Sequence, residues 1–422
     1  SLSSGLQNVL ITDANACTTS TSIVLSEPTL LQTTIVSTTD YNGYEVSCNG
    51  YNDGGASVTV TGSVPSYTYL WPNGETTLNA ISLSSGLQNV LITDANACTT
   101  STSITLTEPT LLQTTIVTTD YNGYDISCNG YSDGGVDLTV TGSVAGYTYL
   151  WDTGDITEDL SNLLAGSYSV DITDANACTT STSIVLSEPI ALQTTIVSTT
   201  DYNTYDISCN GYSDGGIDLT VIGDIAGYTY LWSNSWNSED IYGVSAGAYS
   251  VDITDANACT TSTSIVLSEP TPLQTTIVST TDYNTYDISC SGYSDGGIDL
   301  TVTGSVSGYT YLWNTNDFSE DLNNLSAATY SVDITDANAC TTSTSITLLE
   351  PTALQTTIVS SSNYNGYDIS CNGYSDGGID LTVTGSVAGY TYLWNTNDII
   401  QDLNSLLATT YSVDITDANA CT

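Results

Sequence analysis

Cysteine is the residue in this chain whose type and spacing most directly suggest chemistry. Eleven cysteines lie at positions 17, 48, 98, 128, 178, 209, 259, 290, 340, 371 and 421, and they alternate between an SC context, followed by NG or SG, and a DANAC context. The 422 residues include no histidine, lysine or arginine. Neither a Ser-His-Asp nor a Cys-His nucleophile can therefore be assembled, and no C-x-x-C pair suggests a zinc site. We expect no enzymatic activity, and disulfide bonding is the chemistry to examine.

The cysteines belong to a repeat of about eighty residues, each copy of which closes with Glu-Pro. The closing prolines are Pro28, Pro109, Pro189, Pro270 and Pro351. Residues 1–28 match the end of a repeat, and we interpret them as the C-terminal remnant of a preceding copy in a longer array. We predict five repeats, the last of which lacks its final strand, at residues 29–109, 110–189, 190–270, 271–351 and 352–422.

The repeat has the composition and the alternation of an all-β fold. Turn and strand formers dominate, including 30 Tyr and 34 Gly, and apolar residues do not recur at helical spacing. About seven short strands in each repeat indicate a small immunoglobulin-like sandwich, and we predict tandem sandwiches arranged as an extended rod. In the repeat 271–351 the strands that alternate most clearly are predicted at 273–280, 298–304, 309–313, 330–336 and 342–350.

A tryptophan recurs in the YLW strand of every repeat. In the repeat 271–351 it shares a face with Tyr309 and Tyr311, while Ile298 and Leu300 share a face of an earlier strand. These faces are predicted to pack together in the core. The five core tryptophans are Trp71, Trp151, Trp232, Trp313 and Trp394.

The order of these motifs resembles a known family. ISCNGYSDGG, then GYTYLW, then YSVDITDANAC and a closing SEP are similar to the SprB-type repeat of bacteroidete surface adhesins, a family that includes the gliding-motility adhesin from which it takes its name. The resemblance implies export by the type IX secretion system and display at the extracellular cell surface, with attachment to the outer membrane through parts outside this chain. It implies neighbouring repeats as partners, and it brings no catalytic residues.

An exported location favours disulfide bonds. They are predicted for Cys48, Cys98, Cys128, Cys178, Cys209, Cys259, Cys290, Cys340, Cys371 and Cys421. Three pairings respect the period: Cys128 with Cys178 within a repeat, Cys98 with Cys128 across the short link, or Cys128 with Cys259 of the next repeat. The strands around the two cysteine turns run up, down and up, which places the turns at opposite ends of a sandwich and favours the next-repeat pairing slightly. The within-repeat pairing stays open.

The 46 acidic residues face no basic side chain, so the formal net charge is −46. This excludes nucleic acid and anionic membrane as expected partners, and no apolar run is long enough to insert into a membrane. Most of the acids are interpreted as solvated surface charge. No cofactor is required. A calcium ion at a junction between repeats is a further hypothesis, with Asn129, Asp133, Asp255 and Asn257 as ligands.

Two functions fit the sequence: a structural stalk or filament segment of a long adhesin, and a repeated module that binds glycans or surfaces. The cysteine turns are nearly identical from repeat to repeat, whereas the turn after YLW varies and carries Trp236 in one repeat only. A repeated binding site would keep its contact residues, so this variation favours the stalk. Other copies in a filament and a surface polysaccharide are the further partners considered.

Overall fold

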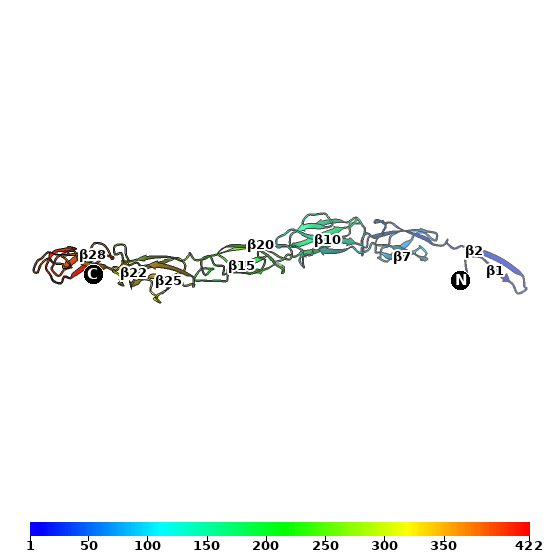
Figure 1. Ribbon diagram of the computed structural model, residues 1–422. Coiled ribbons are helices and arrows are strands. Elements are labelled where there is room, and N and C mark those ends of the chain that lie inside the picture. Colours follow the sequence, from blue (N-terminus) through cyan, green and yellow to red (C-terminus); the bar gives the residue numbers. More distant parts are fainter. Residues whose placement is uncertain (224) are drawn as a thin grey trace. The chain divides into compact units, whose positions relative to one another are not determined.

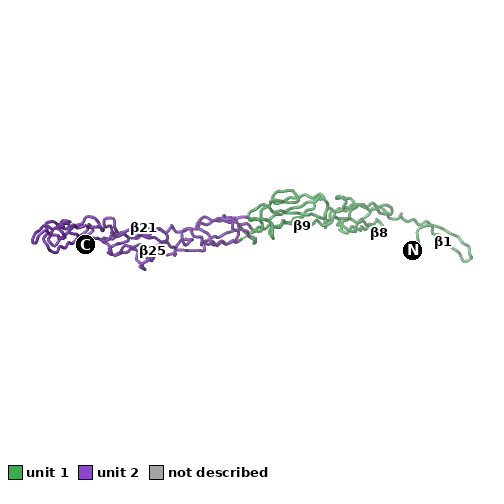
Figure 2. The backbone as a smooth tube through the Cα atoms, viewed as in Figure 1, with its two compact units in different colours: residues 1–192, 223–227, 255–259 green, residues 193–222, 228–254, 260–422 purple. Residues whose placement is uncertain are grey.

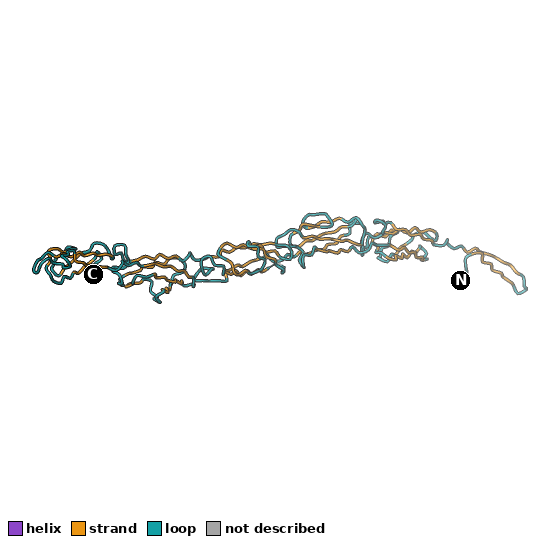
Figure 3. Tube along the Cα trace, viewed as in Figure 1, coloured by secondary structure: helices purple, strands orange, loops and turns teal. Residues whose placement is uncertain are grey.

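The computed structural model describes residues 1–223 and 225–422, and in these residues every regular element is a strand (Figures 1 and 3). Among them there is consequently no helix of the length and apolarity that a membrane crossing needs. The all-β prediction is confirmed. An isolated hairpin of β1 (Gly5–Thr12) and β2 (Thr18–Leu25) comes first, and five sandwiches follow it along the chain.

The strands are assigned to the sandwiches as follows. The first has β3 (Gln32–Ser37), β4 (Gly54–Thr61), β5 (Thr68–Leu70), β6 (Asn79–Leu83), β7 (Gly86–Thr93) and β8 (Thr99–Leu106). The second has β9 (Gln113–Thr118), β10 (Gly134–Thr141), β11 (Thr148–Trp151), β12 (Leu160–Leu163), β13 (Gly166–Thr173) and β14 (Thr179–Leu186). The third has β15 (Gln193–Ser198), β16 (Gly215–Ile222), β17 (Thr229–Trp232), β18 (Ile241–Val244), β19 (Gly247–Thr254) and β20 (Thr260–Leu267).

The two remaining sandwiches differ in strand number. The fourth has β21 (Gln274–Ser279), β22 (Gly296–Thr303), β23 (Thr310–Trp313), β24 (Leu322–Leu325), β25 (Thr329–Thr335) and β26 (Thr341–Thr347). The fifth has β27 (Gln355–Ser360), β28 (Gly377–Thr384), β29 (Thr391–Trp394), β30 (Leu403–Leu406) and β31 (Val413–Thr416). The strand that β26 represents in the fourth sandwich is missing from the fifth, and a groove of about 680 Å³ lined by Ile369 and Leu406 lies open there.

Each complete sandwich consists of two antiparallel three-stranded sheets. In the second, the orders are β12-β10-β9 and β11-β13-β14. These are the A-B-E and C-F-G sheets of a constant-type immunoglobulin domain without strand D, so the immunoglobulin-like prediction is confirmed with six strands instead of about seven. The short strand β24 was not among the strands predicted for the repeat 271–351, because LNNL has too few residues to show an alternating pattern.

The core lies between the two sheets. In the fourth sandwich it joins Ile298 and Leu300 of β22 to Trp313, Val332 and Ile334 of the opposite sheet. The alternation predicted from the sequence is the one observed, with Leu312 exposed between Tyr311 and Trp313. All five recurring tryptophans are at most 2% exposed. Each sandwich is therefore organised around one indole ring.

The DGG sequence that recurs at the start of the second strand has a steric reason. At Gly134 the register of β10 with β12 shifts, and a Cβ there would lie 2.5 Å from Cδ1 of Ile126. A side chain at this position would collide with a core residue that is fully buried. The glycine thus lets the SC loop close over the end of the sandwich.

The chain divides into two compact units (Figure 2). Unit 1 contains residues 1–192, 223–227 and 255–259, and unit 2 contains residues 193–222, 228–254 and 260–422. Two loops of the third sandwich thus belong to unit 1. The predicted repeat boundaries and the extended arrangement stay predictions.

We predict that Trp313→Ala destabilises the fourth sandwich by roughly 3–5 kcal/mol, because it removes the largest buried side chain of that core. The Trp313 Nε1–H also donates to the carbonyl oxygen of Ser319 at 2.9 Å. Hydrogen exchange of the β25 amides in increasing urea measures the effect. Trp236→Ala is the matched control, because Trp236 is 43% exposed, and it should leave exchange in the third sandwich unchanged. Equal effects of the two substitutions would show that Trp313 is not a core residue.

Candidate functional site: the disulfide-linked junctions

Four disulfides join the SC loop of one sandwich to the DANAC turn of the next. They are Cys48–Cys178, Cys128–Cys259, Cys209–Cys340 and Cys290–Cys421, with Cα atoms 5.6–5.7 Å apart. We call each SC loop with its bonded DANAC turn a junction. Every junction lies within one of the two units.

The disulfide prediction does not hold for Cys98 and Cys371, which are free and exposed, as is Cys17. The reason is the spacing of the pairs, which is 130 or 131 residues. Counted backward from Cys98 or forward from Cys371, this spacing leads beyond residues 1–422. The within-repeat pairing and the pairing across the short link occur nowhere among the described residues.

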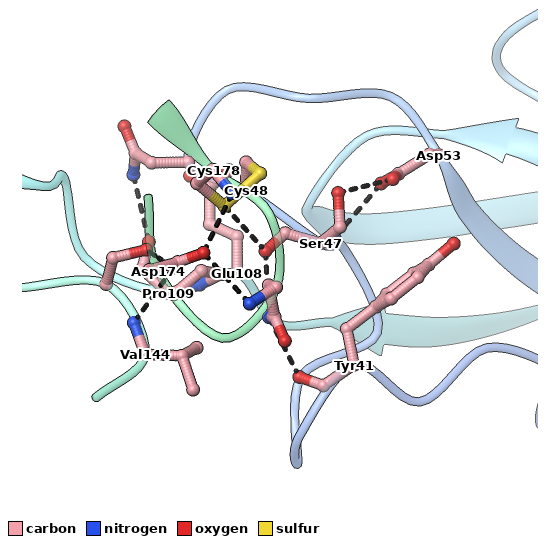
Figure 4. The surroundings of a disulfide bond; sticks show 12 residues. Tyr41, Ser47, Cys48, Asp53, Glu108, Pro109, Val144, Asp174 and Cys178 are labelled. Carbon is pink, nitrogen blue, oxygen red and sulfur yellow. Dashed lines mark hydrogen bonds between the residues drawn. A yellow bond between two sulfur atoms is a disulfide. The ribbon is translucent and has the colours of Figure 1, made fainter. Parts of the chain in front are cut away.

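The DANAC turn is built around its aspartate. Oδ1 of Asp174 accepts hydrogen bonds from the N–H of Asn176 at 2.9 Å and of Cys178 at 2.8 Å (Figure 4). Oδ2 accepts from the Ser143 hydroxyl and from the Val144 N–H at 3.2 Å. Neutral donors thus surround a carboxylate that is 5% exposed, and they hold Cys178 in position for its disulfide.

The turn also requires a left-handed backbone at alanine. Ala177 has φ of 65°, and the other DANAC alanines have φ between 64° and 67°. This conformation disfavours a residue with a Cβ by about 1–2 kcal/mol. The hydrogen bonds to the aspartate therefore maintain a conformation that alanine alone would not adopt.

An asparagine of the DANAC turn inserts into the neighbouring sandwich. Nδ2 of Asn176 donates to the carbonyl oxygens of Tyr41 at 3.2 Å and Ser47 at 3.0 Å, two residues labelled in Figure 4. Oδ1 of Asn176 accepts from Nδ2 of Asn42. Asn257, Asn338 and Asn419 make the same three contacts in the other junctions. This role was not predicted from the sequence, although the unchanged asparagine in every DANAC turn was a signal for it.

The SC loop is tied to the end of its own repeat. Oε2 of Glu108 accepts from the N–H of Gly50 at 2.6 Å, and Nδ2 of Asn49 donates to the Pro109 carbonyl at 3.1 Å. The side chain of Asp53 accepts from Ser47. The Glu-Pro sequence that closes each repeat thus orients the loop that carries the SC cysteine.

The four predicted calcium ligands are brought to one junction, but their observed partners are protein groups. Asn129 donates to the Pro189 carbonyl at 3.0 Å, Asp133 accepts from Ser127, and Asn257 donates to two carbonyls. Among residues 1–223 and 225–422, no three His, Cys, Asp or Glu side chains gather as a metal site. Calcium at the junctions stays a prediction.

Asp255 differs from the other DANAC aspartates. Its Oδ1 accepts from the N–H of Asn257 and Cys259, but its Oδ2 is buried without a partner among the residues that the structure describes. In the other repeats a serine hydroxyl donates to this oxygen. The sequence has Asp224 at the serine position, and residue 224 lies outside the described residues.

We predict that Asn338→Asp loosens the junction of the third and fourth sandwiches. The carboxylate cannot donate to the carbonyls of Tyr202 and Ser208, which leaves buried acceptors facing a negative charge. A loss of about 1.4 kcal/mol corresponds to a tenfold change in the opening equilibrium. The Cys209–Cys340 disulfide should then be reduced by dithiothreitol about tenfold faster, as measured by alkylation and mass spectrometry.

Asn96→Asp is the matched control for this substitution. Asn96 occupies the same DANAC position in the first sandwich, is exposed, and has no side-chain hydrogen bond among the described residues. It should leave all four reduction rates unchanged. An unchanged rate at Cys209–Cys340 in the Asn338 variant would contradict the role assigned to the asparagine.

Hydrogen bonds also set the pH dependence of the junction. Burial works to raise the pKa of Asp336, but the Ser305 hydroxyl and the N–H groups of Cys340, Val306 and Asn338 outweigh it and hold the pKa below its usual value. The stabilisation is therefore complete above the unfolded-state pKa of about 3.9 and is lost as the pH falls through the lower folded-state value.

We predict that Asp336→Asn lowers the free energy of unfolding of the fourth sandwich by about 1–3 kcal/mol at neutral pH, and that the difference from wild type narrows as the pH falls below about 4. Urea titrations at pH 7 and pH 3, followed by hydrogen exchange of β25, measure this. Asp333→Asn makes the same change of charge on the exposed face of β25 and should have little effect at either pH. A difference at pH 3 as large as the difference at pH 7 would rule out the carboxylate as its source.

Solved structures with tandem domains resemble the chain only distantly. A tetra-tandem repeat from the extending region of a large adhesion protein is 14% identical, over 75% of this chain and 98% of that one, with a TM-score of 0.25. Invasin, a bacterial integrin-binding protein, is 13% identical over 79% and 82%, with a TM-score of 0.27. The N-terminal eight Ig domains of Down Syndrome Cell Adhesion Molecule are 10% identical, with a TM-score of 0.27, and this chain spans 63% of their length.

Likenesses of this size do not indicate the role of the chain, and no curated protein matches it. A family model, in contrast, matches once in every sandwich. The SprB repeat is found at residues 44–76, 124–156, 202–237, 283–318 and 365–398. Each match runs from the SC loop through the strand that carries the buried tryptophan. The family resemblance of the motifs is confirmed, and the chain carries five SprB repeats.

Proposed function

We propose that the chain is a stalk segment of a very long secreted adhesin, extending a tip away from the cell or mediating surface attachment and gliding. Type IX secretion, display on the cell surface and attachment to the outer membrane through other parts of the protein belong to the same proposal. The SprB repeats support an adhesin-like segment. The stalk role is inferred from the junctions.

The single observation that carries the proposal is that the same junction recurs four times. Each combines a disulfide with an inserted asparagine that contacts three groups of the preceding sandwich. A flexible string of domains needs no such repeated fixation between neighbours. A covalent bond with three hydrogen bonds restricts rotation of one sandwich against the next, which a stalk requires.

Charge favours the same role. With a formal charge of −46 and no basic side chain, the surface offers no opposite charge for contacts between sandwiches distant along the chain. Mutual repulsion favours extended over folded-back arrangements and is strongest at low ionic strength. It also disfavours close lateral packing of two such chains.

One observation favours a second function, polysaccharide binding. Shallow depressions of about 620–700 Å³ recur on the outer face of the second, third and fourth sandwiches. In the second, the lining includes the hydroxyls of Thr179 and Ser181, the carboxylate of Asp171 and the exposed Leu150. Hydroxyl, carboxylate and apolar groups together suit a neutral sugar.

Length measurements test the stalk. We predict that electron microscopy of the purified chain shows rods to which each sandwich adds on the order of 40 Å, as expected for strands of about eight residues with their turns. Deleting residues 271–351 should shorten the rods by one such increment. Compact particles, or rods that bend freely, would contradict the proposal.

Binding measurements separate the two functions. If the chain only spaces a tip, it should not co-sediment with surface polysaccharide from the cells that produce it. Binding that Leu150→Ser weakens and that the deletion of 271–351 reduces in proportion would favour the second function. Repeating the length measurement with a chelator tests calcium, since unchanged rods would exclude it as a stiffening ion.

A further inference from the structure

The four disulfides overlap along the sequence. Each closes a loop with a sequence separation of 130 or 131, and each later loop begins before the preceding one has ended. Cys128, for example, lies inside the loop closed by Cys48 and Cys178. Consecutive loops are therefore interleaved, and the bonds do not form a simple row.

Following the covalent bonds shows two separate routes along the array. The first track crosses the Cys48–Cys178 bond, follows the chain to Cys209 and crosses to Cys340. The second track uses the other two bonds, Cys128–Cys259 and Cys290–Cys421, with the chain between Cys259 and Cys290.

Each track is much shorter than the chain that it bypasses. Two repeats together contain about 160 residues, but a track follows the chain for only about 30 of them between one disulfide and the next. In the third sandwich, the strands β16–β19 between Cys209 and Cys259, including the buried Trp232, are outside the first track. The first track can therefore transmit tension past the third sandwich even when these four strands have unfolded.

We propose that the interleaved disulfides make the array an extension limiter. At about 3.4 Å per residue, one track spans roughly 110 Å for two fully unfolded repeats, against roughly 550 Å for the open chain. Two folded sandwiches of about 40 Å each already span roughly 80 Å. Away from the two ends of the array, unfolding thus lengthens each oxidised two-repeat span by less than half. This inference deepens the stalk proposal and rests on it.

Burial protects the limiter while the sandwiches are folded. The eight bonded cysteines are only 4–7% exposed. A thiolate must reach a disulfide sulfur directly to exchange with it, so reduction requires a junction to open first. The bonds are therefore protected from exchange until tension opens a junction, and they are intact when the tracks begin to carry load.

The two tracks also make the limiter redundant. If the Cys209–Cys340 bond is lost, the route through Cys128–Cys259 and Cys290–Cys421 still connects the same ends. The shortest covalent path between Cys48 and Cys421 stays at about 80 residues in either case. No single inner disulfide controls the maximum length.

Single-molecule stretching of the 422-residue chain between terminal handles tests the proposal. The oxidised chain should reach a maximum extension of roughly 440 Å, and the same molecule should reach roughly 1,400 Å after dithiothreitol is added. The reduced chain should also show unfolding steps of roughly 250 Å for each sandwich. Steps of that size in the oxidised chain would overturn the extension limiter.

Two variants test the redundancy. Cys209→Ser with Cys340→Ser should keep the maximum near 440 Å, and adding Cys48→Ser with Cys178→Ser removes the whole first track and should raise it only to roughly 540 Å. An increase to the reduced length after the first pair of substitutions would overturn the two-track arrangement. Reduction of wild type gives the same comparison without substitutions. Rods that bend freely in electron microscopy, with the 440 Å limit intact, would refute the stalk and not the limiter.

Discussion

All acidic groups in this chain must be satisfied without a single cationic side chain. Among the described residues, the carboxylates find only N–H and O–H donors in the protein, and the buried Asp174 lies in a turn where several such donors converge. Asp174 orders the DANAC turn in this way, and Glu108 holds the SC loop through the N–H of Gly50. The acids thus determine the conformation of both loops that each disulfide joins. Carboxylates that the composition alone would assign to the solvated surface therefore help to build the junction.

The sequence predicted the sandwiches because their determinants are local. Alternation in IDLTVTG and YTYLW assigns each side chain to a face, and the face that carries Trp313 is the buried one. The strand β24 was not predicted, because its four residues, LNNL, include two asparagines and are too few to show an alternating pattern. An alternating pattern can be recognised only when several residues lie on each face, so the shortest strands cannot be predicted from it.

The junctions could be predicted only in part. The spacing of the cysteines allowed three pairings, and the choice depends on how one sandwich meets the next, which no periodicity within a repeat reports. The role of Asn176 is similar, because its partners at Tyr41 and Ser47 lie in a different repeat. For calcium, the sequence showed oxygen-bearing side chains at Asn129 and Asp133 but not the protein groups that engage them. Contacts between repeats are tertiary information, even where the repeats themselves are nearly identical.

The separation between bonded cysteines also imposes an order in time on the maturation of the array. The partner of Cys128 is Cys259, 131 residues further along the chain. The bond can therefore close only after the DANAC turn of the next sandwich has been made and has folded. Until then the SC cysteine of the most recently formed sandwich remains an unpaired thiol. The DANAC cysteine of the same sandwich cannot capture this thiol if the two loops stay at opposite ends of the fold. Each sandwich is therefore completed by its successor, and the array matures in one direction, one repeat behind its own export.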